Sequence, residues 1–291
     1  MTSSSLTRLR HHGRYLRQQA RRRRQSLVLG PGSHRTLWIC SWQRSGSTWL
    51  LEMLASPLGT RLIYEPANIA DAIVTGEAAA LTELPRTGSP ATRDILRALS
   101  GRLWSSWTDQ MNHSHLPRRA VVKDVRAMWL LDAVSAQRPE VPIVVLLRHP
   151  YDVARSVVDL GWCDPQRSPA DNFAREVALW CDAYDQARDA RALWVAYEDL
   201  LGDPRAQLMR IRAFAANHHP TWEALDVDQV DVGRWSQTNF RQTTSARSDS
   251  PLDPQWIQAA APRLAASPWS AFYGTDGSVV GQLSDVVGME V

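Results

Sequence analysis

Residues 36–54 read TLWICSWQRSGSTWLLEML. The short apolar run at 37–40 is typical of a buried strand, and residues 49–54 follow a helical pattern. The loop between them is rich in small residues. Its backbone N–H groups therefore converge with the positive end of the helix dipole, an arrangement that binds phosphate. Arg44 adds a forked cationic donor to this predicted phosphate loop. The small and hydroxyl residues of the loop are Ser45, Gly46, Ser47 and Thr48.

Outward from this loop, the chain alternates strand and helix patterns. Apolar runs predict further strands at 61–64, 120–122, 142–147 and 193–197. Helical patterns lie at 68–82, 91–107, 126–137, 171–190 and 204–217, and another begins near residue 151. The run at 142–147 is apolar throughout, as in parallel strands buried on both faces. We therefore predict an α/β fold of the P-loop-like type, with three α/β/α layers around a central parallel sheet of about five strands.

The charge of the chain is concentrated at its start. Residues 1–25 contain eight Arg and no acidic residue, so the formal net charge of +3 becomes −5 for residues 26–291. We predict a basic, flexible tail over residues 1–34 and one domain over residues 35–291. The simpler interpretation of this tail is a solvated extension. The alternative is a contact with nucleic acid or a membrane surface.

Several classes of protein are disfavoured by what the sequence lacks. No run approaches the ~20 apolar residues of a membrane span, and the apolar stretch after the basic tail is too short for a signal peptide. Three Cys without a Cys/His cluster indicate neither a disulfide framework nor a metal site. A cytoplasmic protein without a metal is expected.

The phosphate loop differs from the Walker A motif of nucleotide kinases, G-x-x-x-x-G-K-[S/T]. With the second glycine placed at Gly46, the first glycine becomes Ser41 and the lysine becomes Ser47. The cation that neutralises the β- and γ-phosphates is therefore missing. A P-loop kinase-like phosphotransferase remains one alternative. A non-catalytic protein that binds nucleotide or nucleic acid is the other.

A second anion motif follows the strand at 142–147. Arg148 stands at the carboxyl end of this strand, where open α/β sheets bind ligands, and Pro150 suits a helix start. Ser156 lies about one turn into that helix, so Arg148 and Ser156 can hold one phosphate together. An ion-paired arginine at a strand end is the alternative interpretation.

These two motifs resemble those of sulfotransferases that use 3′-phosphoadenosine 5′-phosphosulfate (PAPS). The segment from Arg44 to Trp49, RSGSTW, is similar to the family's 5′-phosphosulfate loop, with Trp49 at the adenine-side position. Arg148, Pro150 and Ser156 match its 3′-phosphate motif. Position 44 is an arginine, which resembles carbohydrate-type members of the family. Cytosolic members usually carry lysine at this position.

Weaker similarities extend the resemblance over roughly residues 36–275. The segment from Tyr197 to Pro204 is similar to the family's Y-E-D-L-x-x-x-P motif, whose tyrosine lies near the adenine. Residues 120–123 resemble the third strand with its terminal lysine, Lys123. Tyr64-Glu65-Pro66 resembles a segment of carbohydrate-type and bacterial members.

The resemblance implies transfer of a sulfuryl group from PAPS to a hydroxyl on a small molecule or carbohydrate, with adenosine 3′,5′-bisphosphate (PAP) as product. Arg44 and Lys123, with the hydroxyl of Ser47 or Thr48, are expected to stabilise charge in the transition state.

A hydroxyl acceptor also needs a base. The histidine of cytosolic members is replaced by Val125, so Glu65 is the first candidate. The other candidates are Asp124, His113 and His115. An ion-paired structural role for Glu65 is an equal alternative.

Two further expectations concern the surroundings of the site. Residues 233–256 read as a long polar loop, in which Arg247 is expected to cover the cofactor. Four tryptophans are candidates to line an acceptor pocket, or else belong to the core: Trp104, Trp107, Trp162 and Trp180.

Overall fold

The computed structural model describes residues 35–55, 59–67, 90–103, 105, 107–111, 117–125, 127–230 and 251–287. The predicted tail, most of the predicted long loop and the helical pattern at 68–82 fall outside these residues. So do four of the candidate site residues: Trp104, His113, His115 and Arg247.

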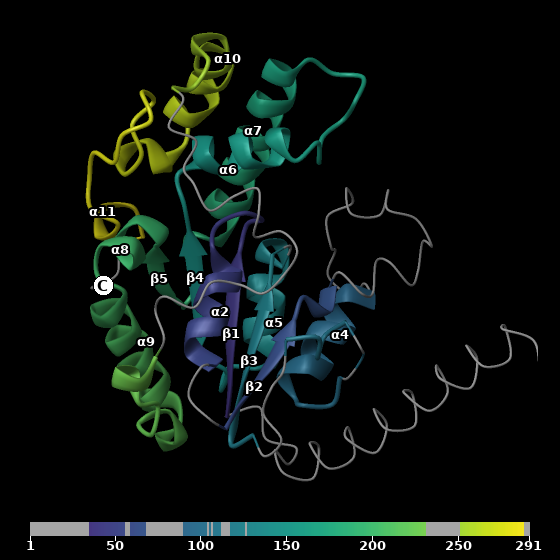
Figure 1. The fold of residues 1–291 in the computed structure, drawn as a ribbon, viewed down its shortest axis with the longest axis vertical. Coiled ribbons are helices and arrows are strands. Elements are labelled where there is room, and N and C mark those ends of the chain that lie inside the picture. The colour runs from purple at the N-terminus through teal and green to yellow at the C-terminus, as the bar shows by residue number, and fades with distance from the viewer. Residues whose placement is uncertain are drawn as a thin grey trace, which may run out of the picture.

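The described chain is built on a five-stranded parallel sheet in the order β2-β3-β1-β4-β5 (Figure 1). The strands are β1 (Thr36–Ser41), β2 (Thr60–Tyr64), β3 (Arg119–Asp124), β4 (Ile143–Leu147) and β5 (Leu193–Ala196). Each apolar run that predicted a strand forms one. The predicted strand at 193–197 ends one residue early, because Tyr197 begins a helix.

Helices cover both faces of the sheet. One face carries α2 (Ser47–Ala55), α8 (Tyr197–Gly202) and α9 (Pro204–His218). The other carries α4 (Pro90–Leu99), α5 (Leu131–Gln137), α6 (Pro150–Asp159) and α7 (Pro169–Ala187), and α10 (Pro254–Ala265) packs on α7. The predicted three-layer α/β/α fold is confirmed.

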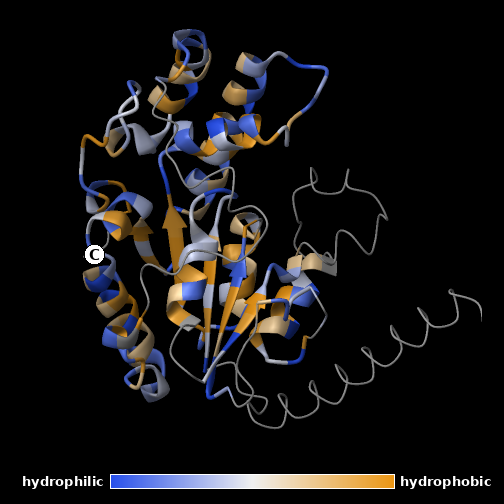
Figure 2. Ribbon diagram, viewed as in Figure 1, coloured by the Kyte–Doolittle hydropathy of each residue, from blue (hydrophilic) through white to orange (hydrophobic). Residues whose placement is uncertain are grey.

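Alternate residues of each strand enter different cores, because strand side chains alternate between the two faces. In β1, Leu37 and Ile39 belong to the core under α2, α8 and α9, whereas Trp38 and Cys40 belong to the core on the opposite face. Figure 2 shows the strands as predominantly hydrophobic, with polar residues on the outer sides of the helices. The sheet therefore stays buried along both faces.

Several helices begin at a proline preceded by a capping side chain. Ser168, Asp203 and Asp253 each accept a hydrogen bond from a backbone N–H in the first turn of α7, α9 and α10. Proline suits the first helical position because its missing N–H would have no partner there. The short remaining elements are η3 (Met128–Leu130), η4 (Pro220–Trp222), η5 (Val227–Gln229), η7 (Pro268–Ala271) and α11 (Ser284–Val287).

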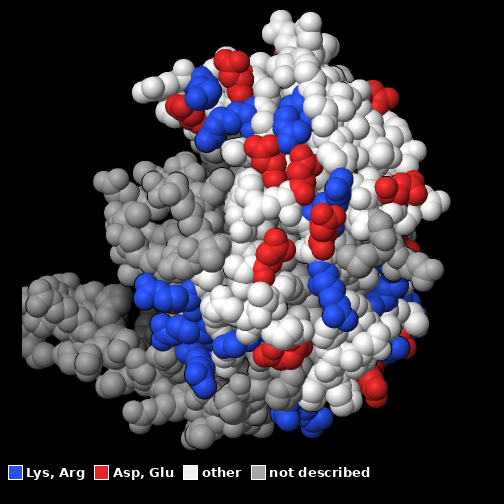
Figure 3. All heavy atoms as spheres, turned by 180° about the vertical axis from the view of Figure 1, so that it is seen from behind, with Lys and Arg blue, Asp and Glu red and all other residues white. Residues whose placement is uncertain are grey.

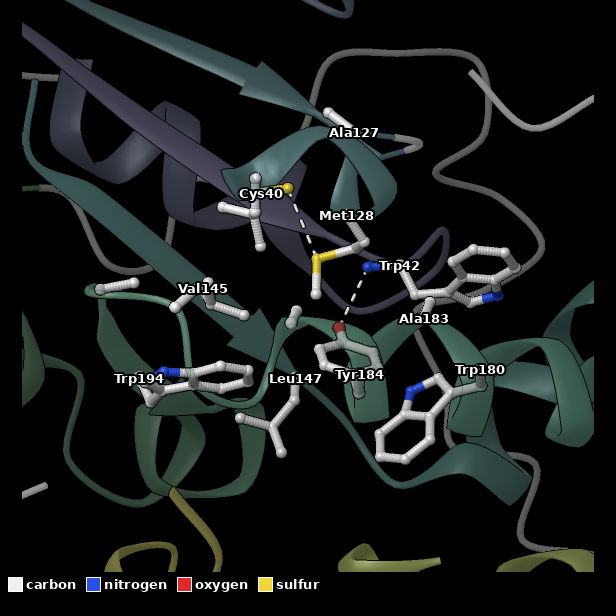
Figure 4. Packing of buried hydrophobic residues seen from close by; sticks show 14 of the residues in the cluster. Cys40, Trp42, Ala127, Met128, Val145, Leu147, Trp180, Ala183, Tyr184 and Trp194 are labelled. Atoms are coloured by element: carbon white, nitrogen blue, oxygen red, sulfur yellow. Dashed lines mark hydrogen bonds between the residues drawn. The ribbon is translucent and has the colours of Figure 1, made fainter. Parts of the chain in front are cut away.

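An aromatic cluster fills the core between the sheet and α7. Trp180 is fully buried and packs on Tyr184, and Trp194 lies on the other side of Tyr184 (Figure 4). Trp269 and Tyr273 complete the cluster. Trp180 is therefore a core residue and not part of an acceptor pocket.

Basic and acidic side chains are interspersed over much of the face in Figure 3, and basic ones also gather at one edge. None of the helices in the described ranges is long and apolar enough to cross a membrane. Within the same residues, no group of three or more His, Cys, Asp and Glu side chains is arranged to hold a metal ion.

Candidate active site

Each strand of the sheet delivers one candidate residue at or just after its carboxyl end. In the order β2-β3-β1-β4-β5 these are Glu65, Lys123, Arg44, Arg148 and Tyr197. The carboxyl ends of parallel strands share one edge, where open α/β sheets bind their ligands. Residues scattered over more than 130 positions of sequence thus form one row.

The predicted phosphate loop connects β1 to α2. The Gly46 carbonyl accepts hydrogen bonds from the N–H groups of Trp49 and Leu50, which starts the helix directly after the loop. The Ser41 hydroxyl donates to the Ser47 hydroxyl at 2.9 Å, which ties the strand end to the first helical residue. Ser45 and Ser47 are buried and Thr48 is half-buried.

The two predicted anion motifs meet at Arg44. Its Nε donates to the Ser156 hydroxyl at 3.0 Å, and its carbonyl accepts from Arg148 at 3.4 Å. Burial lowers the pKa of Arg44, and the neighbouring positive charge of Arg148 lowers it further. Arg148 also contacts Asp152, with 3.5 Å between the charged atoms. The positive charge of Arg148 acts on the Arg44 guanidinium, and a bound anion would offset this repulsion.

Tyr197 joins the second motif to the loop. The Arg148 guanidinium lies 4.8 Å from the centre of the Tyr197 ring, and this ring meets Trp49 edge-on at 6.0 Å. The aromatic rings of Trp49 and Tyr197 therefore lie together beside Arg148. These are the two residues that the family resemblance predicts to lie near the adenine.

Lys123 and Glu65 form a buried ion pair at the other end of the row. The Lys123 ammonium donates to Glu65 Oε1 and lies 4.5 Å from the centre of the Tyr64 ring. Their side chains are 2% and 8% exposed. Burial alone would lower the pKa of Lys123, but the Glu65 charge and other neighbours outweigh it and raise that pKa. Asp124, the second candidate base, accepts a hydrogen bond from the Ala67 N–H.

Arg44 and Glu65 share an unusual backbone conformation. Their φ angles are 62° and 43°, and among the described residues no other non-glycine residue has a positive φ. This conformation costs of order 1–3 kcal/mol and clusters at active sites. The strain thus falls on two residues that the sequence singled out for chemistry.

The profile of the sulfotransferase family matches residues 37–220 of the sequence. This chain belongs to the sulfotransferase family. The match includes β1 from its second residue, the phosphate loop, Lys123, the Arg148 motif and Tyr197. Membership of this family supports a transferase activity. A comparison with curated protein sequences found no match.

Solved sulfotransferase structures are also similar to the chain. One from Alicyclobacillus acidocaldarius shares 13% identity and a TM-score of 0.45, covering 79% of this chain and 92% of that one. A mouse sulfotransferase in complex with PAP shares 13% identity and a TM-score of 0.46, with 83% and 87% coverage. One from Mycobacterium avium shares 13% identity and a TM-score of 0.44, with 93% and 84% coverage.

The chain also carries supporting residues that sequence reasoning missed. Glu198 accepts a hydrogen bond from the His149 N–H at 2.9 Å and another from the Tyr273 hydroxyl at 3.0 Å, which fixes the strand end beside Arg148. Burial raises the pKa of Glu198. His149 itself caps α6 through its ring nitrogen. Glu198 stands within the Tyr197 motif, so its position was available as a signal.

Two of the predicted acceptor-pocket tryptophans lie on the surface beside the candidate site. Trp107 is 39% exposed and contacts Tyr64, with ring centres 5.5 Å apart. Trp162 is 45% exposed, and the Arg44 guanidinium lies 5.5 Å from its ring centre. Trp107 therefore packs against the residue that precedes Glu65, and Trp162 packs against Arg44.

Proposed function

We propose that this chain transfers a sulfuryl group from PAPS to a hydroxyl acceptor on a small molecule or sugar. The observation that carries the proposal is the hydrogen bond from Arg44 to Ser156, which joins the two anion motifs into one site. A donor with phosphate at both the 3′ and the 5′ side needs two such anion sites close together. Family membership supports the same chemistry.

The order of residues along the sheet edge suggests how PAPS lies. We place its 3′-phosphate at Arg148 and Ser156 and its adenine beside Trp49 and Tyr197. Its 5′-phosphosulfate lies over the loop from Arg44 to Thr48, on the side toward Lys123. Arg247 remains a proposed contact that covers the cofactor. Placed in this way, the nucleotide extends from β5 to β1, and β3 and β2 follow β1 in the strand order. The sulfur at its β1 end therefore faces Lys123 and Glu65.

Transfer then needs charge stabilisation and removal of one proton. The acceptor oxygen forms a bond to sulfur, the bond from sulfur to the bridging oxygen breaks, and PAP leaves. Arg44 and Lys123 stabilise the charge that develops on the departing oxygen, with the hydroxyl of Ser47 or Thr48. Glu65 takes the acceptor proton. We propose that the Lys123 ammonium moves toward the bridging oxygen as charge builds there, which releases Glu65 to act as the base.

The two exposed indoles suggest where the acceptor sits. Trp107 reaches the site through Tyr64 at the end of β2, and Trp162 reaches it through Arg44 after β1. Strand β3 lies between β2 and β1, so the carboxyl ends of β2 and β1 stand about 10 Å apart at the usual strand spacing. We propose that the acceptor lies between Trp107 and Trp162, with its hydroxyl toward Glu65.

Three free cysteines accord with action in a reducing cytoplasm, as in a bacterial cell. The proposal also retains residues 35–291 as one catalytic domain, with residues 1–34 as a basic extension.

The activity is tested with PAPS labelled in its sulfuryl group and a panel of phenols, alcohols and sugars. We expect label on an acceptor and release of one PAP for each transfer. Glu65→Gln should lower kcat by about 10²–10⁴-fold, the usual effect of removing a general base. If no acceptor takes up the label although PAPS binds, a non-catalytic nucleotide-binding role replaces this proposal.

A further inference from the structure

Helix α7 holds the phosphate loop from behind through a buried carboxylate. Glu176 Oε1 accepts hydrogen bonds from the Trp42 indole N–H at 2.6 Å and from the Gln43 side-chain amide at 2.8 Å. Glu176 is 5% exposed and lies on the face of α7 that carries Phe173 and Trp180. A carboxylate on an apolar helix face is costly unless its oxygens are used. Here one oxygen anchors two consecutive residues at the loop entrance.

A phenol on the same face of α7 anchors the loop backbone. The Tyr184 hydroxyl accepts from the Trp42 N–H at 3.0 Å (Figure 4). It also donates to the Leu146 carbonyl at 2.7 Å. Burial raises the pKa of Tyr184, so the hydroxyl keeps the proton that it donates.

This bridge stands where β1 and β4 separate. Ser41 and Leu146 are the last pair in the register of the two strands. The Tyr184 hydroxyl therefore links the two strands at the point where their pairing ends. It lets β1 diverge from β4 into the loop without leaving the Trp42 N–H unpaired.

These contacts act on the residue that follows them. Arg44 comes directly after Trp42 and Gln43 and has a φ of 62°, a conformation that persists only when its surroundings impose it. Three hydrogen bonds from α7 fix the two preceding residues. A negative charge near an anion site opposes anion binding, so Glu176 contributes as a hydrogen-bond acceptor and not through its charge.

We propose that Glu176 and Tyr184 are positioning residues that preset the phosphate loop, and Arg44 in particular, for the phosphosulfate end of the nucleotide. Neither residue touches the nucleotide. The inference rests on the proposed PAPS site, and it adds the device that holds this site in its binding geometry before the ligand arrives.

The test measures PAP affinity by calorimetry, at a temperature below the unfolding midpoint of every variant. Glu176→Ala should weaken PAP binding by about tenfold, the factor expected when one to two ordinary hydrogen bonds are lost. Glu176→Gln should bind PAP as tightly as the unaltered chain, because its amide oxygen can accept both N–H groups. Tyr184→Phe keeps the ring in the core and should weaken binding several-fold.

A matched control lies on the same helix. Asp185 accepts hydrogen bonds from Arg263 and Ser267, on the side of α7 that faces α10. Asp185→Ala should therefore lower stability and leave PAP affinity within about twofold. The inference is overturned if Glu176→Ala binds PAP as tightly as Asp185→Ala, or if Glu176→Gln fails to restore binding. If the unaltered chain does not bind PAP, the proposed function itself fails and this inference with it.

Discussion

Gly46 and the ring of Tyr197 lie so close that a Cβ atom at position 46 would stand 2.5 Å from two carbons of the ring. Gly46 also has a φ of 88°, a region that residues with a side chain rarely adopt. The loop and the Tyr197 motif therefore require glycine here for two independent reasons. This contact brings the loop after β1 against the residue that follows β5.

Gly46→Ala should lower the free energy of unfolding by about 1–3 kcal/mol, because it adds both backbone strain and a steric clash. It should also weaken PAP binding, since the Tyr197 ring, which contacts Trp49 and Arg148, must shift to relieve the clash. Chemical denaturation and calorimetry measure the two effects. Gly202→Ala is the control, because nothing lies within 4 Å of the added methyl. Equal stability of both variants would contradict the account of this contact.

Lys123→Met should destabilise the protein by about 3–5 kcal/mol, because it leaves the Glu65 carboxylate buried without the cation that balances its charge. The raised pKa of Lys123 means that this stabilisation is complete below the ordinary lysine value of 10.5 and is lost only as pH rises through the higher folded-state pKa. Denaturant titrations at pH 8 and pH 11 should show the difference between the two proteins shrinking at the higher pH.

The exposed ion pair between Arg205 and Asp228 is the control for this measurement, since both side chains are 66% exposed. Arg205→Ala should cost roughly 1 kcal/mol or less. A similarly small loss for Lys123→Met would show that the buried pair contributes no more than a surface one.

Trp107→Ala should raise the acceptor KM by about tenfold while kcat and PAP affinity stay nearly unchanged, because Trp107 is proposed to contact the acceptor and not the nucleotide. The measurement uses the best acceptor from the panel. Leu201→Ala, at another exposed apolar side chain, should leave all three constants unaltered. An unchanged acceptor KM in Trp107→Ala would place the acceptor elsewhere.

The three cysteines should differ sharply in reactivity. Burial raises the pKa of Cys181 to about 12 and that of Cys40 well above its usual range, whereas Cys163 is half-exposed. Only the thiolate reacts, so a thiol reagent at pH 8 should modify one cysteine in the folded protein and all three in denaturant. Rapid reaction of all three without denaturant would contradict the described core.

Much of this architecture follows from local sequence. The apolar runs predicted every strand, and the small residues around Gly46 predicted the loop, because burial and loop chemistry leave local patterns. The place of Arg148 at the end of β4 followed from the same reasoning. The strand order β2-β3-β1-β4-β5 did not, since it depends on pairing between distant segments.

The supports of the site were the hardest part to predict. Glu176 and Trp42 are separated by 134 residues, so no local pattern joins them. The sequence offered one signal for this support. Glu176 lies three residues after Phe173, so it is an acidic residue on the apolar face of the predicted helix at 171–190. Sequence likewise did not separate Trp180, in the core, from Trp107, on the surface, because both are large apolar side chains in helical or turn-forming stretches.

In the proposed PAPS site, two anion sites, one built on Arg44 and one on Arg148, bind a 3′,5′-bisphosphorylated nucleotide. Calorimetric titration with PAP, with 5′-AMP, ADP and Mg²⁺-ATP in parallel, measures this selectivity. We predict micromolar binding of PAP without metal, strong weakening when the 3′-phosphate is absent, and loss of PAP binding in Arg148→Ala. Equal binding of PAP and 5′-AMP, or a Mg²⁺-dependent preference for ATP, would contradict the account and favour a kinase-like protein.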